Sequence, residues 1–187
     1  WRIANKEIER NAKKLIVEDG IKIVGESVFN LFNLSEVILP NSLKEIEARA
    51  FCSCEIKKIT IPKNVTKIGS SAFADCSELK EITILGNINS QTSFLGEGQN
   101  VKLNLAGFCG TIGIMSAYNS LSINFMPGNK KYIWKKGFIM SPNKKHLYLY
   151  TGIGKKKTNK TIAIPDTVEV IEPGAISWAS NIKMGKT

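Results

Sequence analysis

The sequence predicts a solenoid of the α/β class, in which short strands and partly helical corners recur about every 22 residues. One phrase is written twice in succession, as VILPNSLKEIEARAFCSC and then as ITIPKNVTKIGSSAFADC. Corresponding residues of the two copies, such as Pro40 with Pro62 and Cys54 with Cys76, are all 22 positions apart. A repeat of this length is typical of solenoids, because one such unit buries too little apolar surface to be stable without stacked neighbours.

Each part of the phrase has a structural reading. Ile59 and Ile61 lie two residues apart, so both side chains point to one side of an extended segment, which we expect to be the core. Pro62 cannot donate a ladder hydrogen bond and should end the strand. The pair Ala72 and Phe73 places a small residue beside a large ring, which suits a tight corner that is helical or irregular.

Further copies extend the repeat on both sides. LIVEDGIKIVGESVF aligns with the next copy at a step of 22, although Glu18 replaces the proline. A fourth copy begins with Ile82 and Ile84 and then loses the alanine–phenylalanine corner in the polar stretch 86–100, which predicts an irregular loop. A fifth strand is expected over residues 101–105.

The pattern changes after residue 120. A strand over 121–125 is followed by two alternating runs, KYIWKKGFIM and KKHLYLY, which flank a polar turn and predict an inserted β-hairpin. TIAIPDTVEVIEPGAI then restores the repeat, with Pro165 and Ala175 at the offset seen between Pro40 and Ala50.

We therefore expect one solenoid domain over residues 1–187, a length that can bury a sizeable core. Its parts are a lead-in or cap at 1–12, repeats at 13–118 with a degenerate stretch at 86–118, a strand and inserted hairpin at 120–157, and a final repeat at 158–187. No apolar run approaches the roughly 20 residues of a membrane span. The first residues also lack the apolar run of a signal peptide.

The repeated phrase resembles the BspA-like leucine-rich repeat family of bacterial surface proteins. It matches that family's pattern at Pro62, Val65, Ile68, Gly69, Ala72, Phe73 and Cys76. A hairpin similar to one inserted between repeats of the family is matched at Asn129, Tyr132, Gly137, Ser141 and Tyr150. The resemblance covers residues 13–84 and 120–182. It implies a right-handed leucine-rich repeat solenoid with a parallel sheet on its concave face, in a secreted or cell-surface protein that adheres to host or matrix proteins.

The outward residues of the predicted strands form a candidate binding face. In chain order this row reads Ile16, Ile38, Thr60, Thr83, Asn104, Asn124 and Ala163. Lysines beside the row suggest a basic column, and an apolar spot rimmed by lysines is a plausible protein contact. The candidate residues are Ile16, Ile38, Thr60, Thr83, Lys57, Lys58, Lys80 and Lys102. The alternative is that both isoleucines are tolerated strand residues on a solvated face.

Charge suggests a second candidate surface. The net charge is +10, and residues 101–187 hold 13 Lys and Arg against 3 Asp and Glu, whereas residues 1–100 are balanced at 13 against 13. A sulfated glycan or another polyanion is therefore a second candidate partner, with solubility as the plain alternative. The lysines concerned are Lys135, Lys136, Lys144, Lys145, Lys155, Lys156 and Lys157. The aromatic residues among them favour a hairpin that packs its rings on the solenoid, so nucleic acid is not an expected partner.

Catalytic chemistry has little support in the sequence. His146, the only histidine, lies beside lysines in the predicted hairpin and is expected to be a solvated surface residue. Cys54 and Cys76 occupy one repeat position, where buried unpaired thiols are expected, and the Cys52–Cys54 spacing alone is weak evidence for zinc. We predict no catalytic residue, metal or cofactor. The chain is expected to be a non-enzymatic recognition module, with polyanion binding and a structural envelope role as alternatives.

Overall fold

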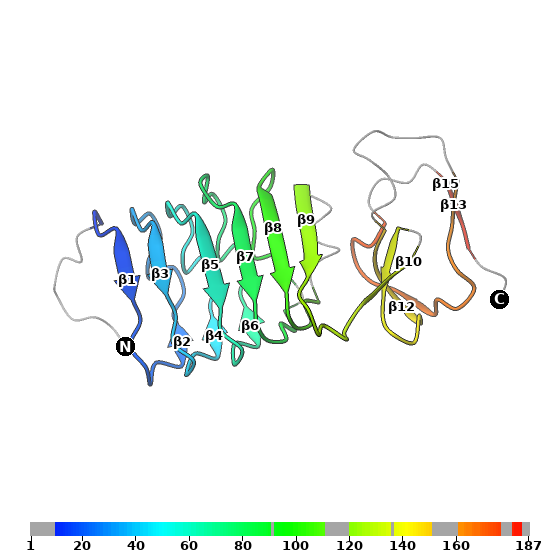
Figure 1. Ribbon diagram of the computed structural model, residues 1–187. Coiled ribbons are helices and arrows are strands. Elements are labelled where there is room, and N and C mark those ends of the chain that lie inside the picture. The colour runs from blue at the N-terminus through cyan, green and yellow to red at the C-terminus, as the bar shows by residue number, and fades with distance from the viewer. Residues whose placement is uncertain are drawn as a thin grey trace.

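The computed structural model describes residues 10–90, 92–110, 120–135, 137–150, 161–176 and 181–184. Over these ranges the chain forms stacked coils followed by a smaller β-unit (Figure 1). The same ranges contain no helix, and therefore none long and apolar enough to cross a membrane.

The coils place one long row of strands side by side (Figure 1). These strands are β1 (Lys14–Ile16), β3 (Glu36–Ile38), β5 (Lys58–Ile61), β7 (Glu81–Ile84), β8 (Asn100–Leu105) and β9 (Ser120–Phe125). All pairings in the row are parallel, with Ile59 level with Ile82 and Ile82 level with Leu103. The predicted parallel solenoid strands are thus confirmed, whereas handedness stays a prediction.

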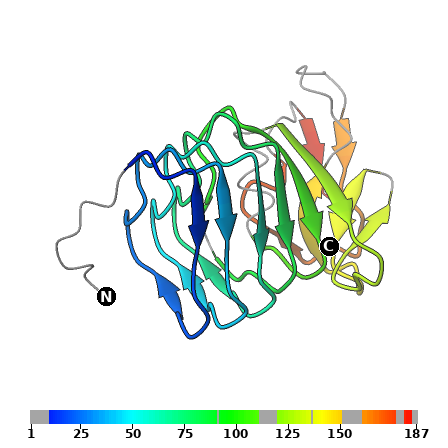
Figure 2. The same ribbon diagram turned by 60° about the vertical axis from the view of Figure 1, so that its left-hand side comes forward.

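A second, shorter row of strands lies along the lower edge of the coils (Figure 2). It consists of β2 (Ile23–Val24), β4 (Glu45–Ile46) and β6 (Lys67–Ile68), again paired in parallel. The sequence pattern predicted no strand around Ile46 or Ile68. Both side chains are buried, but the backbone around them also forms a ladder.

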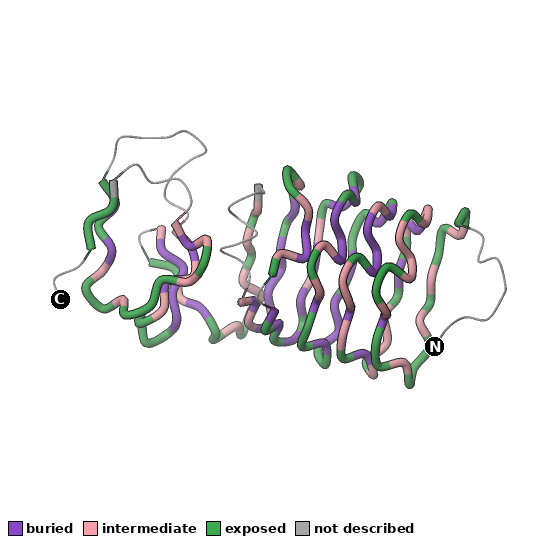
Figure 3. The backbone as a smooth tube through the Cα atoms, turned by 180° about the vertical axis from the view of Figure 1, so that it is seen from behind, coloured by how far each residue is buried: buried purple, intermediate pink, exposed green. Residues whose placement is uncertain are grey.

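The core is a continuous apolar column between the strand rows and the corners, visible as buried segments in Figure 3. At the corners, the rings of Phe29, Phe51 and Phe73 stack nearly parallel, with centroids 5.5 and 5.6 Å apart. Phe94 continues the column edge to face, 6.4 Å from Phe73. Offset-stacked and edge-to-face geometries are the favourable ones for aromatic pairs.

The corners are irregular, and the expected helical element of the α/β class is absent from the described residues. Arg49 and Ser53 have φ values of +53° and +58°, and Ser71 and Asp75 have +56° and +57°. A residue in the left-handed region interrupts a right-handed helix, and each corner holds two of them. The N–H groups of the corners instead donate hydrogen bonds to carbonyls of the following coil, as Phe51 N does to Ala72 O at 2.9 Å.

The degenerate stretch 86–118 keeps more of the repeat than we expected. Phe94 supplies the missing ring, and the Ser90 hydroxyl bonds both the N–H and the C=O of Ile68, in place of a strand partner for β6. Gln99 donates through Nε2 to Phe73 O at 3.1 Å. Residues 111–119 lie outside the described ranges.

The predicted hairpin exists and is larger than expected. The strands β11 (Phe138–Met140) and β12 (His146–Tyr150) pair antiparallel around the predicted turn, but β10 (Ile133–Lys135) also pairs antiparallel with β11. The first predicted arm is therefore two strands, with Gly137 at φ +85° between them. We call β10, β11 and β12 the meander.

The final repeat is split between two sheets. The strand β14 (Val170–Ile171) pairs in parallel with β12, whereas β13 (Thr161–Ala163) pairs in parallel with β15 (Asn181–Lys183). Ala163 therefore does not continue the long strand row, because the meander follows β9 in that direction (Figure 1). Ile171 follows Pro165 at the same offset at which buried Ile46 follows Pro40, yet Ile171 is exposed.

Aromatic packing joins the meander to the coils. The Tyr132 ring stacks between Phe108 at 5.8 Å and Phe125 at 5.1 Å. The Tyr132 hydroxyl accepts a hydrogen bond from Cys109 N and donates one to Cys109 O at 2.9 Å. Within the meander, Tyr148 packs on the coils against Phe108, as the sequence favoured. Phe138 and Tyr150 instead pack in a second apolar cluster with Ile162 and Ala175, and Trp134 is 70% exposed.

Candidate functional site

The outward side of β1, β3, β5, β7, β8 and β9 forms one surface, which we call the sheet face. The strand register puts Ile16 level with Ile38, Thr60 level with Thr83, and Thr83 level with Asn104. Ile16 is 58% exposed and Ile38 is 44% exposed, so two neighbouring apolar side chains stand in water. Alternation along the strands explains this, because residues on either side of each one point into the core.

A groove interrupts the sheet face between β3 and β5. These strands lie next to each other (Figure 2) but belong to separate sheets, and no backbone hydrogen bond joins them. On the other sides of the same coils, β4 still pairs with β6 and Phe51 N still bonds Ala72 O. The coils therefore stay attached while the sheet face opens.

The groove has a volume of about 780 Å³. Its lining combines apolar side chains at the strand ends with charged and hydroxyl side chains on the strands. The residues include Glu36, Ile38, Leu39, Lys57, Lys58, Thr60, Pro62, Glu81, Thr83 and Leu85. Five of the candidate residues from the sequence are among them, whereas Ile16, Lys80 and Lys102 lie outside the groove.

The expected basic column is a mixed row of charges. Lys14 pairs with Glu36 at 2.9 Å, and Lys102 lies 3.6 Å from Glu81. Lys80 turns back to donate to Ser77 O at 3.2 Å. These groups are exposed except Glu81, which is half-buried, so each pair contributes little to stability, but the acids cancel much of the positive charge.

Beyond the groove, the sheet face continues as a ladder of polar side chains that we did not anticipate as a connected feature. Asn104 is buried and donates to Thr83 Oγ1 at 3.3 Å and to Glu81. Asn124 in turn donates to Asn104 Oδ1 at 2.9 Å. The sequence signal was the recurrence of short polar residues at the outward position of successive strands.

The lysines of the second candidate surface are dispersed. Lys135 and Lys144 are exposed, and Lys145 is exposed but pairs with Glu169 at 2.7 Å. Lys136 and the run 155–157 lie outside the described residues.

The groups that could carry catalysis are engaged in structure. His146 is half-buried, and its Nδ1 lies 2.8 Å from Glu172 Oε1, which links β12 to β14. All four cysteines are buried, and Cys54 and Cys76 form no disulfide, in agreement with the expectation for these two. Burial raises the pKa of the Cys54 thiol to about 11 and that of Cys76 to about 12. In the part of the chain that the structure describes, no cluster of His, Cys, Asp and Glu could hold a metal ion.

Parallel strand rows over a stacked apolar core define a solenoid repeat protein with an open sheet face. Residues 7–124 match the BspA type leucine rich repeat region, in six copies. The chain therefore belongs to the BspA-type leucine-rich repeat family, as its repeated phrase suggested. No curated protein matches the sequence.

Solved structures show the same fold at low identity. The pneumococcal vaccine antigen PcpA is 18% identical, with a TM-score of 0.61 over 94% of this chain and 46% of that one. A leucine-rich repeat protein from Eubacterium ventriosum is 20% identical, with a TM-score of 0.52 over 94% of this chain and 48% of that one. The chain thus spans about half the length of these relatives.

Proposed function

We propose that this chain is a non-enzymatic recognition module that binds a protein partner, at the bacterial cell surface, through the groove and the isoleucines beside it. The observation that carries the proposal is the opening of the sheet between β3 and β5 next to exposed Ile16 and Ile38. The family membership supports an interaction role, and the similar structures include a vaccine antigen.

The chemistry of the surface favours a protein as the partner. Exposed apolar side chains rimmed by charged ones are typical of interaction sites, where the apolar centre supplies affinity and the rim supplies orientation. The opposite charges of Glu36, Lys58 and Glu81 suit a partner with both signs rather than a pure polyanion. The stacked coils hold this surface rigid, so little ordering is needed on binding. A host or matrix protein fits this description.

The test is binding of the purified chain to immobilised matrix proteins at low and high salt. We expect binding that persists at high salt and is weakened at least about tenfold in the Ile16→Glu/Ile38→Glu variant, because a central apolar contact is lost. Ile171→Glu is the matched control, since Ile171 is an exposed strand isoleucine outside the sheet face. Equal loss in both variants, or no loss in either, would contradict the assignment to the sheet face.

Polyanion binding is the second candidate, favoured by the 13 basic against 3 acidic residues of the second half. Binding to a sulfated glycan should collapse between low and high salt, because the affinity comes from released counterions. It should fall in a Lys135→Glu/Lys144→Glu variant, and in a variant of residues 155–157, while the isoleucine variant binds normally. Absence of binding to either class would favour the structural envelope role.

A further inference from the structure

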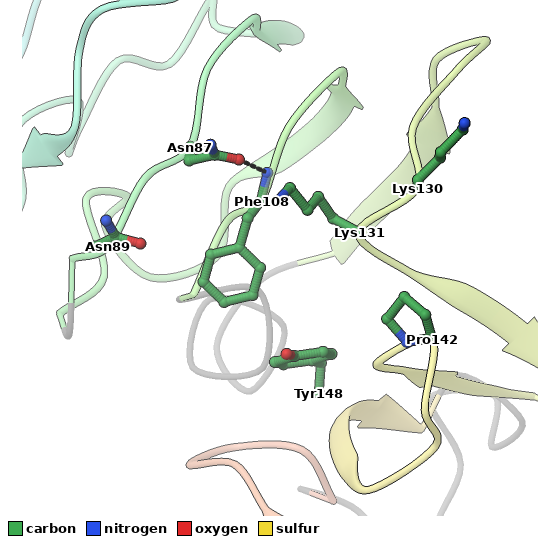
Figure 4. Close-up of a pocket in the computed structure, with 7 residues that line it drawn as sticks. All are labelled: Asn87, Asn89, Phe108, Lys130, Lys131, Pro142 and Tyr148. Atoms are coloured by element: carbon green, nitrogen blue, oxygen red, sulfur yellow. Dashed lines mark hydrogen bonds between the residues drawn. The ribbon is translucent and has the colours of Figure 1, made fainter.

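A second hollow, of about 480 Å³, lies where the meander meets the coils (Figure 4). We call it the junction pocket, and it shares no lining residue with the groove. Separate parts of the chain contribute its walls, which are Asn87, Asn89, Phe108, Lys130, Lys131, Pro142 and Tyr148.

Two aromatic rings form a fixed corner in the junction pocket. The rings of Phe108 and Tyr148 lie 5.4 Å apart with their planes at 68°. Behind them, the Tyr132 ring stacks on Phe108 and meets Tyr148 edge to face at 5.4 Å. Because Cys109 anchors the Tyr132 hydroxyl, the corner is held in place before any ligand arrives. A flat aromatic ligand could stack on only one of these planes, whereas a saturated ring with C–H groups on several sides can contact both.

The polar side chains of the junction pocket indicate which polar groups a ligand should carry. Asn87 Oδ1 accepts a hydrogen bond from Phe108 N at 2.9 Å, which fixes the amide and leaves its NH₂ group to donate. Lys131 extends toward Phe108, whereas Lys130 points away (Figure 4). Neither lysine forms an ion pair with the residues described. An ammonium can only donate, and its strongest hydrogen bonds are the charge-assisted ones to anionic acceptors, of which a carboxylate is one.

We propose that the junction pocket binds one acidic sugar unit, such as a hexuronate. The sugar carboxylate would lie against Lys131, its hydroxyls would meet the Asn87 amide, and its C–H face would pack on Phe108 and Tyr148. Hydroxyl groups suit an amide side chain, since both donate and accept hydrogen bonds. The inference does not rest on the proposed protein-binding function, because the two sites share no residue.

The experiment is a titration of the ¹⁵N-labelled chain with a glucuronate-containing disaccharide, followed by the amide shifts of Lys131 and Tyr148. The matching neutral disaccharide and a pentaglutamate peptide serve as comparison ligands. We expect saturable shifts with the acidic sugar alone and about tenfold weaker binding in Lys131→Gln, because a charge-assisted hydrogen bond is lost. Tyr148→Leu should weaken binding as well, while Lys144→Gln, at an exposed lysine outside the pocket, should leave it unchanged.

Each outcome bears on the assignment. Lys131 is exposed, so Lys131→Gln should keep its unfolding midpoint, and that variant carries the test even if Tyr148→Leu is destabilised. The proposal is overturned if the neutral sugar binds equally well, if Lys131→Gln binds normally, or if the acidic sugar causes no shift. Tighter binding of pentaglutamate to the same amides would also overturn it, in favour of an acidic peptide. Retained sugar binding in Ile16→Glu/Ile38→Glu would separate this site from the sheet face.

Discussion

Single side chains keep the corner carbonyls satisfied from coil to coil. Cys54 Sγ donates to Phe29 O, and Cys76 Sγ donates to Phe51 O, each at 3.2 Å. In the next coil Gln99 Nε2 does the same for Phe73 O at 3.1 Å. The cysteines of the repeat are therefore hydrogen-bond donors, and an amide can replace a thiol at this position. Their role needs no redox chemistry.

The thiol of Cys76 should make stability fall at alkaline pH. Burial raises its pKa from 9.0 to about 12, so between these values the unfolded chain loses a proton that the folded chain keeps. The full contribution of this thiol to the free energy of unfolding is therefore present below pH 9. Above pH 9 the free energy of unfolding falls by up to about 1.4 kcal/mol per pH unit. Urea unfolding at pH 8 and at pH 10.5 measures the decline, which should be shallower in Cys76→Ala. Equal declines in both proteins would rule the thiol out as the cause.

At the scale of the elements, the groove between β3 and β5 should be visible in the backbone. N–H groups alternate sides along a strand. Val17 N and Glu36 N bond across the β1–β3 pair, to Ile38 O and Lys13 O, which leaves the N–H of Val37 pointing toward β5. That edge has no ladder hydrogen bond.

In β3, amide exchange rates should therefore not follow side-chain burial: the residue with the buried side chain should have the faster-exchanging amide. We expect the Val37 amide to exchange at least about tenfold faster than the Glu36 amide, although the Val37 side chain is buried and that of Glu36 is exposed. Amide-resolved exchange by NMR measures both rates. Slower exchange at Val37 than at Glu36 would indicate that β3 and β5 pair in solution.

The turns that follow the strands depend on close approach between neighbouring coils. A Cβ at Gly107 would lie 1.9 Å from Gly86 O, whereas a Cβ at Gly25 would come no closer than 3.7 Å, to Glu47 Oε2. Gly107→Ala should destabilise the protein by about 1–3 kcal/mol, because backbone must move. Gly25→Ala should be neutral or should stabilise the protein by up to about 1 kcal/mol, because alanine lowers the conformational entropy of the unfolded chain. Thermal unfolding of the two variants checks the contrast, which fails if both shift in the same direction.

At the scale of the whole molecule, Tyr132 couples the meander to the coils. Tyr132→Phe removes two hydrogen bonds to Cys109 and should lower stability by about 1–3 kcal/mol. The control is Tyr150→Phe, since the Tyr150 hydroxyl makes no hydrogen bond within the described ranges while its ring packs 4.5 Å from Phe138. Chemical unfolding measures both. A loss in Tyr150→Phe as large as that in Tyr132→Phe would show that hydroxyl solvation, not coupling, sets the effect.

The features of the fold that could be predicted are those that leave a periodic pattern in the sequence. The long strands and their register were readable, because Ile59, Ile82 and Leu103 alternate with polar neighbours at nearly constant steps. Two-residue strands such as β4 and β6 are too short to show alternation. The corners were expected to be helical or irregular, and the sequence could not decide between the two, because left-handed residues such as Arg49 and Asp75 carry no distinctive composition.

The candidate site was predictable only in part. Exposure of Ile16 and Ile38 follows from alternation, and the acids that neutralise the lysines stand at the same repeat position as those lysines. The groove gave no signal, since β3 and β5 keep the same step of 22 as β1 and β3. The junction pocket depends on how the meander docks, which no local pattern of residues encodes.

The forward direction of the corner hydrogen bonds has a consequence for how the protein is made. Phe29 N, Phe51 N and Phe73 N each donate to a carbonyl 21 residues further along the chain. A nascent chain leaving the ribosome cannot close its last corner until the following coil has been synthesised and has emerged. Folding during translation would then advance one coil at a time, because each corner forms its hydrogen bonds only when the next coil is present. The folded part of the chain would therefore always end one coil before the most recently emerged coil.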